Sequence, residues 1–351
     1  MVRNNAVGFF GKRHELAAPC EGRDAILTDL DGVVYRGAHA VAHAVEILNE
    51  LAITRTIGYL TNNASRTAEE VAAQLTELGL HAHPDDVVTS AQAAVRLLGN
   101  YVPPGSTILV VGGTGLFEEL KYAGYVPTRS GADDPVAVIQ GFARDVGWEQ
   151  LAEAAFVLGG ATPEERPWIA TNTDWTIPLE RGIAPGNGTL VSAVHTAAGR
   201  LPIVAGKPET PIFTEALARF HATKPLFIGD RLDTDIAGAV RAGIDSALVL
   251  TGVDGPKQII AAPPDSRPTY ILNDLRDLTR PYPSTVTDRS GVVTVGKSSV
   301  VIDGHDVRIL GDGEGSSSGI ENIDLLRAAA QAIWNSPISL YGLNVPERLY
   351  Q

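Results

Sequence analysis

Cysteine is almost absent from this chain, which has only Cys20 among its 351 residues. One cysteine excludes an intramolecular disulfide and a zinc site built from cysteines, and it is typical of a reducing compartment. No apolar run approaches the roughly 18 residues that a membrane span needs. Residues 1–16 also lack the apolar stretch of a signal peptide. We therefore expect a cytoplasmic protein with no membrane insertion.

Basic residues are also few. Lysine and arginine number 28 against 41 aspartates and glutamates, which gives a formal net charge of −13. Because no basic block offsets this charge, we expect no nucleic-acid partner and no anionic-membrane partner. The eight histidines show no metal-ligand spacing. An anionic substrate would need a locally positive pocket on this acidic protein.

The pattern of apolar residues indicates the fold class. Short apolar runs alternate with helical patterns through residues 25–274, which favours a parallel sheet with helical crossovers. Thr67 and Glu70 have the spacing of a capping box, so we expect a helix to start there. The stretch PYPSTVTDRS at 281–290 reads as a linker, and it is followed by short strands and one helix.

Polar residues come directly after four of the apolar runs. They are Asp29 with Asp31, Thr61 with Asn62, Lys207, and Asp230. The carboxyl ends of parallel strands meet at one edge of a sheet, so we expect these residues to lie together. Residues i and i+2 of an extended chain point the same way, so both aspartates of the first pair would face one volume.

Each motif has another explanation when it is taken alone. The Asp-x-Asp-Gly can be a polar turn, the Thr-Asn a helix cap, and the lysine before a proline a solvated side chain. Taken together, the carboxylates form an all-oxygen pocket that best matches Mg²⁺. Lys207 and strand-end amides add a site for a phosphoryl group. One aspartate can then be a nucleophile, and the other a general acid and base.

These motifs resemble those of the haloacid dehalogenase superfamily of phosphatases. They read DLDGV (29–33), LTNNAS (60–65), GKP (206–208) and GDRLDTDI (229–236). The resemblance implies that Asp29 is the nucleophile and Asp31 the general acid and base. It also implies a Mg²⁺ ion held by Asp29, Asp230 and the backbone carbonyl of Asp31.

The resemblance assigns further residues around this centre. The phosphoryl group would be bound by the residues of two motifs, namely Thr61, Asn62, Asn63 and Lys207. Asp233 and Asp235 would support them from the start of the next helix.

The long separation of the second and third motifs points to an insertion. About 145 residues lie between Thr61 and Lys207, far more than a crossover needs. The stretches GVVYRG, TSAQAA, ATNTDWTIPLERG and PGNGTLVSAV resemble the subgroup with a large α/β cap, which includes NagD-type, p-nitrophenyl-phosphatase-like, pyridoxal phosphate and phosphoglycolate or glycerol 3-phosphate phosphatases. In that subgroup ATNTDW borders the active-site mouth. Asn172 and Asp174 are therefore candidates for contacting the substrate, and a capped turn is the alternative.

We therefore predict an α/β fold with a Rossmann-like parallel-sheet core, an inserted α/β cap domain and a small C-terminal α+β domain. The predicted segments are 1–19 for an N-terminal extension, 20–91 and 196–282 for the phosphatase core, 92–195 for the cap, and 283–351 for the C-terminal domain. The added C-terminal domain resembles that of glycerol 3-phosphate phosphatases of the mycobacterial kind.

The expected function is that of a Mg²⁺-dependent phosphomonoesterase acting on a small phosphorylated metabolite through an aspartyl-phosphate. Glycerol 3-phosphate is the first choice of substrate on the resemblance alone. Phosphoglycolate, pyridoxal phosphate, a nucleotide or a sugar phosphate are alternatives. A non-catalytic regulatory protein that binds phosphorylated metabolites is an alternative of another class. A homo-oligomer formed through the cap or the C-terminal domain is left open.

Overall fold

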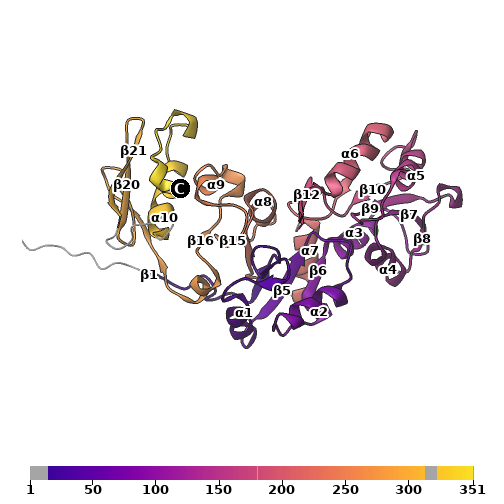
Figure 1. The fold of residues 1–351 in the computed structure, drawn as a ribbon, viewed down its shortest axis with the longest axis horizontal. Helices are drawn as coiled ribbons and strands as arrows, with labels where there is room; N and C mark the ends of the chain where they lie inside the picture. Colours follow the sequence, from indigo (N-terminus) through magenta and orange to yellow (C-terminus); the bar gives the residue numbers. More distant parts are fainter. Residues whose placement is uncertain (1–14, 180, 313–321, 351) are drawn as a thin grey trace, which may run out of the picture. The chain divides into compact units, whose positions relative to one another are not determined.

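The computed structural model describes residues 15–179, 181–312 and 322–350 (Figure 1). Most of the predicted N-terminal extension and the glycine-rich segment 313–321 lie outside these residues. The chain divides into a larger unit of residues 22–254 and 263–276 and a smaller unit of residues 1–21, 255–262 and 277–351. None of the described helices has the length and apolar character that crossing a membrane requires.

A parallel sheet of six strands forms one part of the larger unit. Its strand order is β16-β15-β14-β2-β5-β6, and every neighbouring pair is parallel. The strands are β2 (Ala25–Thr28), β5 (Thr56–Thr61), β6 (Val87–Thr89), β14 (Leu226–Gly229), β15 (Asp245–Val249) and β16 (Tyr270–Leu272). The helices between them are α1 (Ala44–Ala52), α2 (Ala68–Glu77), α3 (Ser90–Leu98), α7 (Pro211–Phe220) and α8 (Ala237–Arg241). The predicted parallel-sheet α/β core is confirmed.

Burial explains why these short runs form strands. All four residues of β2 and all four of β14 are buried, as expected for central parallel strands covered by helices. Phe213 of α7 and Phe227 of β14 pack edge to face, with ring centroids 5.0 Å apart and planes at 72°. The capping box is also confirmed, because Glu70 donates its backbone N–H to Thr67 and accepts one in return.

A second parallel sheet, of five strands, forms the other part of the larger unit. Its order is β13-β10-β9-β7-β8. The strands are β7 (Thr107–Val111), β8 (Val126–Thr128), β9 (Ala137–Gln140), β10 (Trp168–Ala170) and β13 (Ile203–Val204). Its helices are α4 (Thr114–Tyr122), α5 (Trp148–Leu158) and α6 (Asn187–Ala198), and Figure 1 shows them around this sheet. This is an α/β layer inserted between the second and third motifs.

Two short antiparallel hairpins complete the larger unit. One follows the first motif and joins β3 (Tyr35–Arg36) to β4 (His39–Ala40). The other joins β11 (Thr176–Leu179) to β12 (Gly182–Pro185) in the inserted layer. The apolar pattern did not predict either hairpin, because each strand has only two to four residues.

The strand before Lys207 corrects one expectation. We predicted that all four motifs follow strands of a single sheet, but β13 pairs with β10 of the five-stranded sheet, with Ile203 opposite Ile169. An apolar run in the sequence indicates a buried strand, but it does not say which of two parallel sheets receives it. The third motif therefore approaches the site from the inserted layer.

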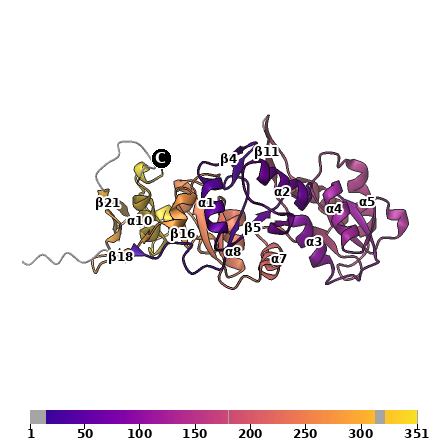
Figure 2. The same cartoon turned by 90° about the horizontal axis from the view of Figure 1, so that it is seen from below.

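The smaller unit holds antiparallel strands and one long helix. Its four-stranded sheet is β18 (Thr285–Thr287), β19 (Val293–Val295), β20 (Ser298–Asp303) and β21 (Asp306–Asp312), and a separate pair joins β1 (Glu15–Leu16) to β17 (Tyr282–Pro283). The helix α10 (Ile323–Trp334) packs against β19 and β20, beside the short helix α9 (Pro256–Ile260). Figure 2 shows α10 together with β18 and β21. A small α+β C-terminal part is thus confirmed, whereas the predicted domain boundaries stay predictions.

The predicted linker at 281–290 is wrong in part, because β17 and β18 lie within it. Thr285, Val286 and Thr287 pair with residues of β19. Their β-branched side chains favour an extended chain, and this preference outweighs the breaking effect of the nearby prolines.

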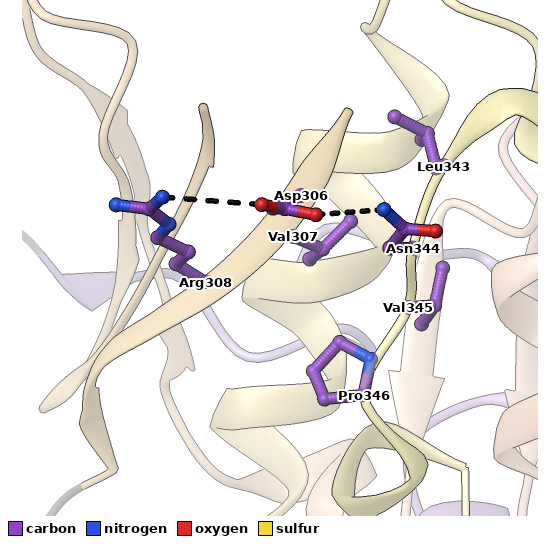
Figure 3. A pocket seen from close by; sticks show the side chains of 7 residues that line it. All are labelled: Asp306, Val307, Arg308, Leu343, Asn344, Val345 and Pro346. Carbon is purple, nitrogen blue, oxygen red and sulfur yellow. Dashed lines mark hydrogen bonds and ion pairs between the residues drawn. The ribbon is translucent and has the colours of Figure 1, made fainter. Parts of the chain in front are cut away.

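A shallow hollow of about 670 Å³ lies on the smaller unit (Figure 3). Its lining consists of Asp306, Val307, Arg308, Leu343, Asn344, Val345 and Pro346. Asp306 accepts a hydrogen bond from Asn344 at 2.7 Å and lies 3.9 Å from Arg308, so the charges in the hollow are largely paired. It contains none of the residues of the four motifs.

We predict that Phe213→Ala lowers the free energy of unfolding by about 3–5 kcal/mol, since it removes a fully buried ring from the contact with Phe227. Chemical denaturation followed by circular dichroism measures the loss. Phe156→Ala, which removes a ring that is 70% exposed on α5, is the matched control and should change little. Equal stability of the two variants would contradict this view of the core.

Candidate active site

The first motif lies at the carboxyl edge of the six-stranded sheet. Asp29 follows the central strand β2, and its backbone N–H donates to Ile228 O of β14 at 2.8 Å. The chain then turns, because the N–H groups of Val34 and Tyr35 both donate to Leu30 O. Asp31 lies in this turn and is exposed, whereas Asp29 is only partly exposed.

Three carboxylates converge at this edge. Asp29, Asp230 and Asp235 each offer an oxygen, and these oxygens lie within 4.8 Å of one another. Asp230 directly follows β14, the strand next to β2, and Asp235 lies on the π-helical turn Leu232–Ile236 that comes next. Asp230 and Asp235 are each only 1% exposed. The sequence predicted Asp235 as a supporting residue, but the structure places its carboxylate among the central ones.

Lys207 lies between two of these carboxylates. Its Nζ is 2.7 Å from Asp235 Oδ1 and also donates to Asp29 Oδ1, and the side chain is 3% exposed. Burial alone would lower the pKa of Lys207, but the charges of Asp235 and Asp29 raise it above its ordinary value. The lysine is therefore a fixed positive charge at neutral pH.

The same burial acts on the carboxylates in the opposite direction. It raises the pKa of Asp29 well above its ordinary value, opposed by Lys207 and reinforced by Asp235 and Asp230. Burial and the charge of Asp235 raise the pKa of Asp230 to about 7, although a hydrogen bond from the Val253 N–H opposes this. One ammonium does not neutralise three carboxylates in so small a volume.

The surroundings of Asp230 fit a cation. Its Oδ1 is buried and has no hydrogen-bond partner among the described residues, while Oδ2 accepts from Val253 N at 2.8 Å. Glycines allow this packing, since a Cβ at Gly32 would lie 2.3 Å from Oδ2 and one at Gly252 only 1.9 Å from it. Gly32 also has a φ of +81°, which disfavours a side chain. An unpartnered carboxylate oxygen among acidic neighbours suits a hard divalent ion.

The second motif lies beside Lys207. Thr61 ends β5, is 4% exposed, and accepts a hydrogen bond from the Asn63 N–H at 3.1 Å. The Asn62 amide bonds to the backbone of Lys207 at both N and O, at 2.8 and 3.0 Å. Asn63 instead bonds within its own loop, where its Oδ1 accepts from Ser65.

The inserted layer adds two of the predicted residues to this group. Asn172 Nδ2 donates to Asn62 O at 2.7 Å, and the carboxylate of Asp174 accepts from Asn62 Nδ2 at 3.2 and 3.3 Å. Burial raises the pKa of Asp174, and the hydrogen bond from Asn62 opposes this rise. Both residues therefore face the motif loop.

Two predicted residues lie apart from the central carboxylates. Asp233 is exposed and pairs with Arg231 at 2.8 Å, and it is not a member of the carboxylate cluster of Asp29, Asp230 and Asp235. Asp31 is exposed, yet partial loss of hydration raises its pKa, opposed by the charges of Arg66 and Lys207. Sequence reasoning missed Arg66, whose only signal was a basic residue directly after the motif LTNNAS.

Comparison with known proteins agrees with this arrangement. A profile of haloacid dehalogenase-like hydrolases matches residues 26–126, and one of HAD-hydrolase-like proteins matches residues 204–278. The chain is 42% identical to the D-glycerol 3-phosphate phosphatase of Mycobacterium tuberculosis over 323 residues, which cover 89% of this chain and 86% of that protein. It is 36% identical to the acid sugar phosphatase of Staphylococcus saprophyticus over 260 residues, covering 72% and 96% of the two chains.

The chain belongs to the haloacid dehalogenase-like hydrolases. The two matched stretches of this hydrolase contain all four motifs, with Asp29 and Thr61 in the first and Lys207 and Asp230 in the second. Both of the relatives named above match it over most of their length, and both are phosphatases.

Solved structures give the same family. The glycerol phosphate phosphatase of Mycobacterium tuberculosis in complex with magnesium matches with a TM-score of 0.82 and 39% identity, covering 94% of this chain and 95% of that one. The p-nitrophenyl phosphatase of Archaeoglobus fulgidus matches with a TM-score of 0.67 and 27% identity, covering 73% and 98%. The second match stops short of the full chain, in line with an addition to the shared hydrolase fold.

We predict that Asp230→Asn weakens Mg²⁺ binding at least about tenfold, because it removes a buried carboxylate from the cluster. Isothermal titration calorimetry with Mg²⁺ measures the change. Asp233→Asn is the matched control, since it removes an exposed carboxylate three residues away, and it should bind Mg²⁺ like the wild type. Equal weakening by both substitutions would place the ion outside the cluster.

Proposed function

We propose that this hydrolase is a Mg²⁺-dependent phosphomonoesterase in which Asp29 is the nucleophile. The observation that carries the proposal is the ion pair of the buried Lys207 with Asp29, beside two further carboxylates. A phosphoryl group brought to Asp29 meets the positive charge of Lys207. Mg²⁺ would be held by the side chains of Asp29 and Asp230 and by the backbone carbonyl of Asp31, and it would supply further positive charge against the phosphoryl oxygens. The magnesium complex of the mycobacterial relative supports this choice of ion.

The proposed reaction has two steps. In the first, a carboxylate oxygen of Asp29 attacks phosphorus, the ester P–O bond breaks, and Asp31 gives a proton to the leaving alkoxide. In the second, Asp31 takes a proton from water, the water oxygen attacks phosphorus, and the acyl-phosphate bond breaks to release phosphate and restore Asp29. Lys207 and Thr61 hold the phosphoryl oxygens in both steps. The raised pKa of Asp31 supports a role as proton donor.

We propose glycerol 3-phosphate as the substrate. The support is the D-glycerol 3-phosphate phosphatase that matches 89% of this chain. A sugar phosphate is the second candidate, because an acid sugar phosphatase matches 72% of it. In both cases Asn172 and Asp174 of the inserted layer would contact the part of the substrate that leaves. A cytoplasmic location, drawn from the single cysteine, is part of the same proposal.

We predict that phosphate release needs both Mg²⁺ and Asp29. A panel of glycerol 3-phosphate, phosphoglycolate, pyridoxal phosphate, a nucleotide and a sugar phosphate is assayed with Mg²⁺ and with EDTA. Asp29→Asn should lower kcat at least about a thousandfold, because only the nucleophile is lost. A variant that keeps more than about a tenth of the wild-type rate would remove Asp29 from that role. No release from any ester by the wild type would favour a binding protein without catalysis.

Lys207→Met should lower kcat/KM by at least about a hundredfold, because it removes the buried positive charge that contacts Asp29 and meets the phosphoryl group there. Steady-state kinetics with the best substrate of the panel give the value. Lys224→Met removes an exposed lysine of the same unit and should leave kcat/KM unchanged. Circular dichroism separates a folding defect from a loss of function. A folded Lys207→Met variant with wild-type kcat/KM would demote this lysine to a structural role.

A further inference from the structure

The side chain of Asn62 holds the backbone of a residue 145 positions away. Its Oδ1 accepts from the Lys207 N–H at 2.8 Å, and its Nδ2 donates to Lys207 O at 3.0 Å. These two bonds satisfy both the backbone N–H and the backbone carbonyl of Lys207. The Asn62 amide is thereby used on both its oxygen and its nitrogen.

Lys207 needs these hydrogen bonds to its backbone because it reaches the site from a different sheet than Asp29 does. It follows β13, which belongs to the five-stranded sheet, whereas Asp29 follows β2 of the six-stranded sheet. The hydrogen bonds of the sheet that carries Asp29 therefore do not fix the lysine. The approach is also close, since a Cβ at Gly206 would lie 2.5 Å from Thr171 O and 2.7 Å from Asn62 Oδ1. The chain passes directly against the Asn62 side chain.

Asn62 is also bonded to the inserted layer. Its Nδ2 faces both oxygens of Asp174, at 3.2 and 3.3 Å, and its backbone carbonyl accepts from Asn172 Nδ2 at 2.7 Å. Asn172 in turn accepts from the Asp174 N–H at 3.1 Å and, through its carbonyl, from Asn187 of α6 at 2.7 Å. These bonds link Asn62 to the loop after β10 and to the start of α6.

We propose that Asn62 is a positioning residue, which holds Lys207 against Asp29 and connects this lysine to Asp174 of the inserted layer, and that it is not itself a phosphate ligand. The inference rests on the proposed phosphatase function. It differs from the expectation from sequence, in which Asn62 and Asn63 both bind the phosphoryl group.

The first test is a pair of single substitutions. Asn62→Ala should lower kcat by about tenfold to a hundredfold, because a shift of about 1 Å in a charge-stabilising group is enough for a loss of that size. The factor should be the same for p-nitrophenyl phosphate and glycerol 3-phosphate, since the phosphoryl group is common to both. Asn49→Ala is the matched control: Asn49 likewise bridges two backbone groups, those of Gly79 and His81, and its loss should leave kcat unchanged.

The second test separates positioning from direct binding. If Asn62 acts through Lys207, then Asn62→Ala should lower kcat little further when it is added to Lys207→Met. Rates with p-nitrophenyl phosphate, which has a good leaving group, keep the weak double variant measurable. Losses that multiply would assign Asn62 an independent contact with the phosphoryl group and overturn the proposal.

A third arm remains informative if Asn62→Ala folds poorly. Asn62→Asp keeps an acceptor for the Lys207 N–H but sets a carboxylate against that of Asp174, so kcat should fall about as far as in Asn62→Ala. Adding Asp174→Asn restores a donor opposite the new carboxylate and should recover kcat at least about threefold, whereas Asp174→Asn alone should not raise it. No recovery in folded protein would overturn the link to Asp174.

The outcomes distinguish this inference from the proposed function. Wild-type rates in folded Asn62→Ala, with an active wild type, would overturn the positioning role and leave the phosphatase proposal standing. A wild type and an Asn49→Ala variant that both release no phosphate would overturn the two together.

Discussion

The structure depends on the repulsion among three converging carboxylates, two of them buried, and on Lys207, which opposes it. Two charged oxygens 4.8 Å apart repel by roughly 3 kcal/mol at an effective dielectric constant of about 20, and Asp29, Asp230 and Asp235 lie at least this close to one another. Lys207 contacts two of the three at ion-pair distance. Burial first, and the excess negative charge in addition, explain why the pKa values of Asp29 and Asp230 are raised. The excess charge also explains why a divalent cation suits this place better than a second buried lysine, which would fill the space that a substrate needs.

The arrangement of strands brings these charges together without any contact between sequence neighbours. Asp29 and Asp230 follow adjacent parallel strands, so the sheet itself fixes their separation. Asp235 reaches the same point because a π-helical turn directly after Asp230 brings its carboxylate back to the N–H groups of Asp230 and Arg231. Lys207 comes from the other sheet. The site is therefore complete only when both sheets of the larger unit are folded, which ties the inserted layer to the chemistry.

Much of the site could be predicted because its residues follow apolar runs. Asp29 and Asp230 directly follow strands that are buried throughout, and Thr61 ends a strand that is buried except at its first residue. Such runs are visible in sequence together with the polar residue that stops them. The capping box of Thr67 was visible for the same reason, since its rule spans only four residues. The sheet to which β13 belongs was not visible, because its apolar pattern suits either sheet. Strands β17 and β18 were hidden by prolines, which are usual at the ends of short edge strands.

Sequence reasoning could not decide which residue of two neighbouring residues of the same type lies in the site. Asn62 and Asn63 are adjacent amides in one motif, yet one bonds across 145 positions to Lys207 and the other only within its loop. Asp233 and Asp235 are both acidic residues of one helical turn, yet one is exposed and pairs with Arg231 while the other is buried beside Lys207. In each pair the composition and the spacing to the strand are nearly the same, and only the direction of the side chain differs. That direction is set by a partner far away in sequence, which is Lys207 for both Asn62 and Asp235. Contact with Lys207 thus distinguishes the asparagine and the aspartate that belong to the site from their neighbours. This contact forms only when the inserted layer is folded, because Lys207 follows a strand of that layer.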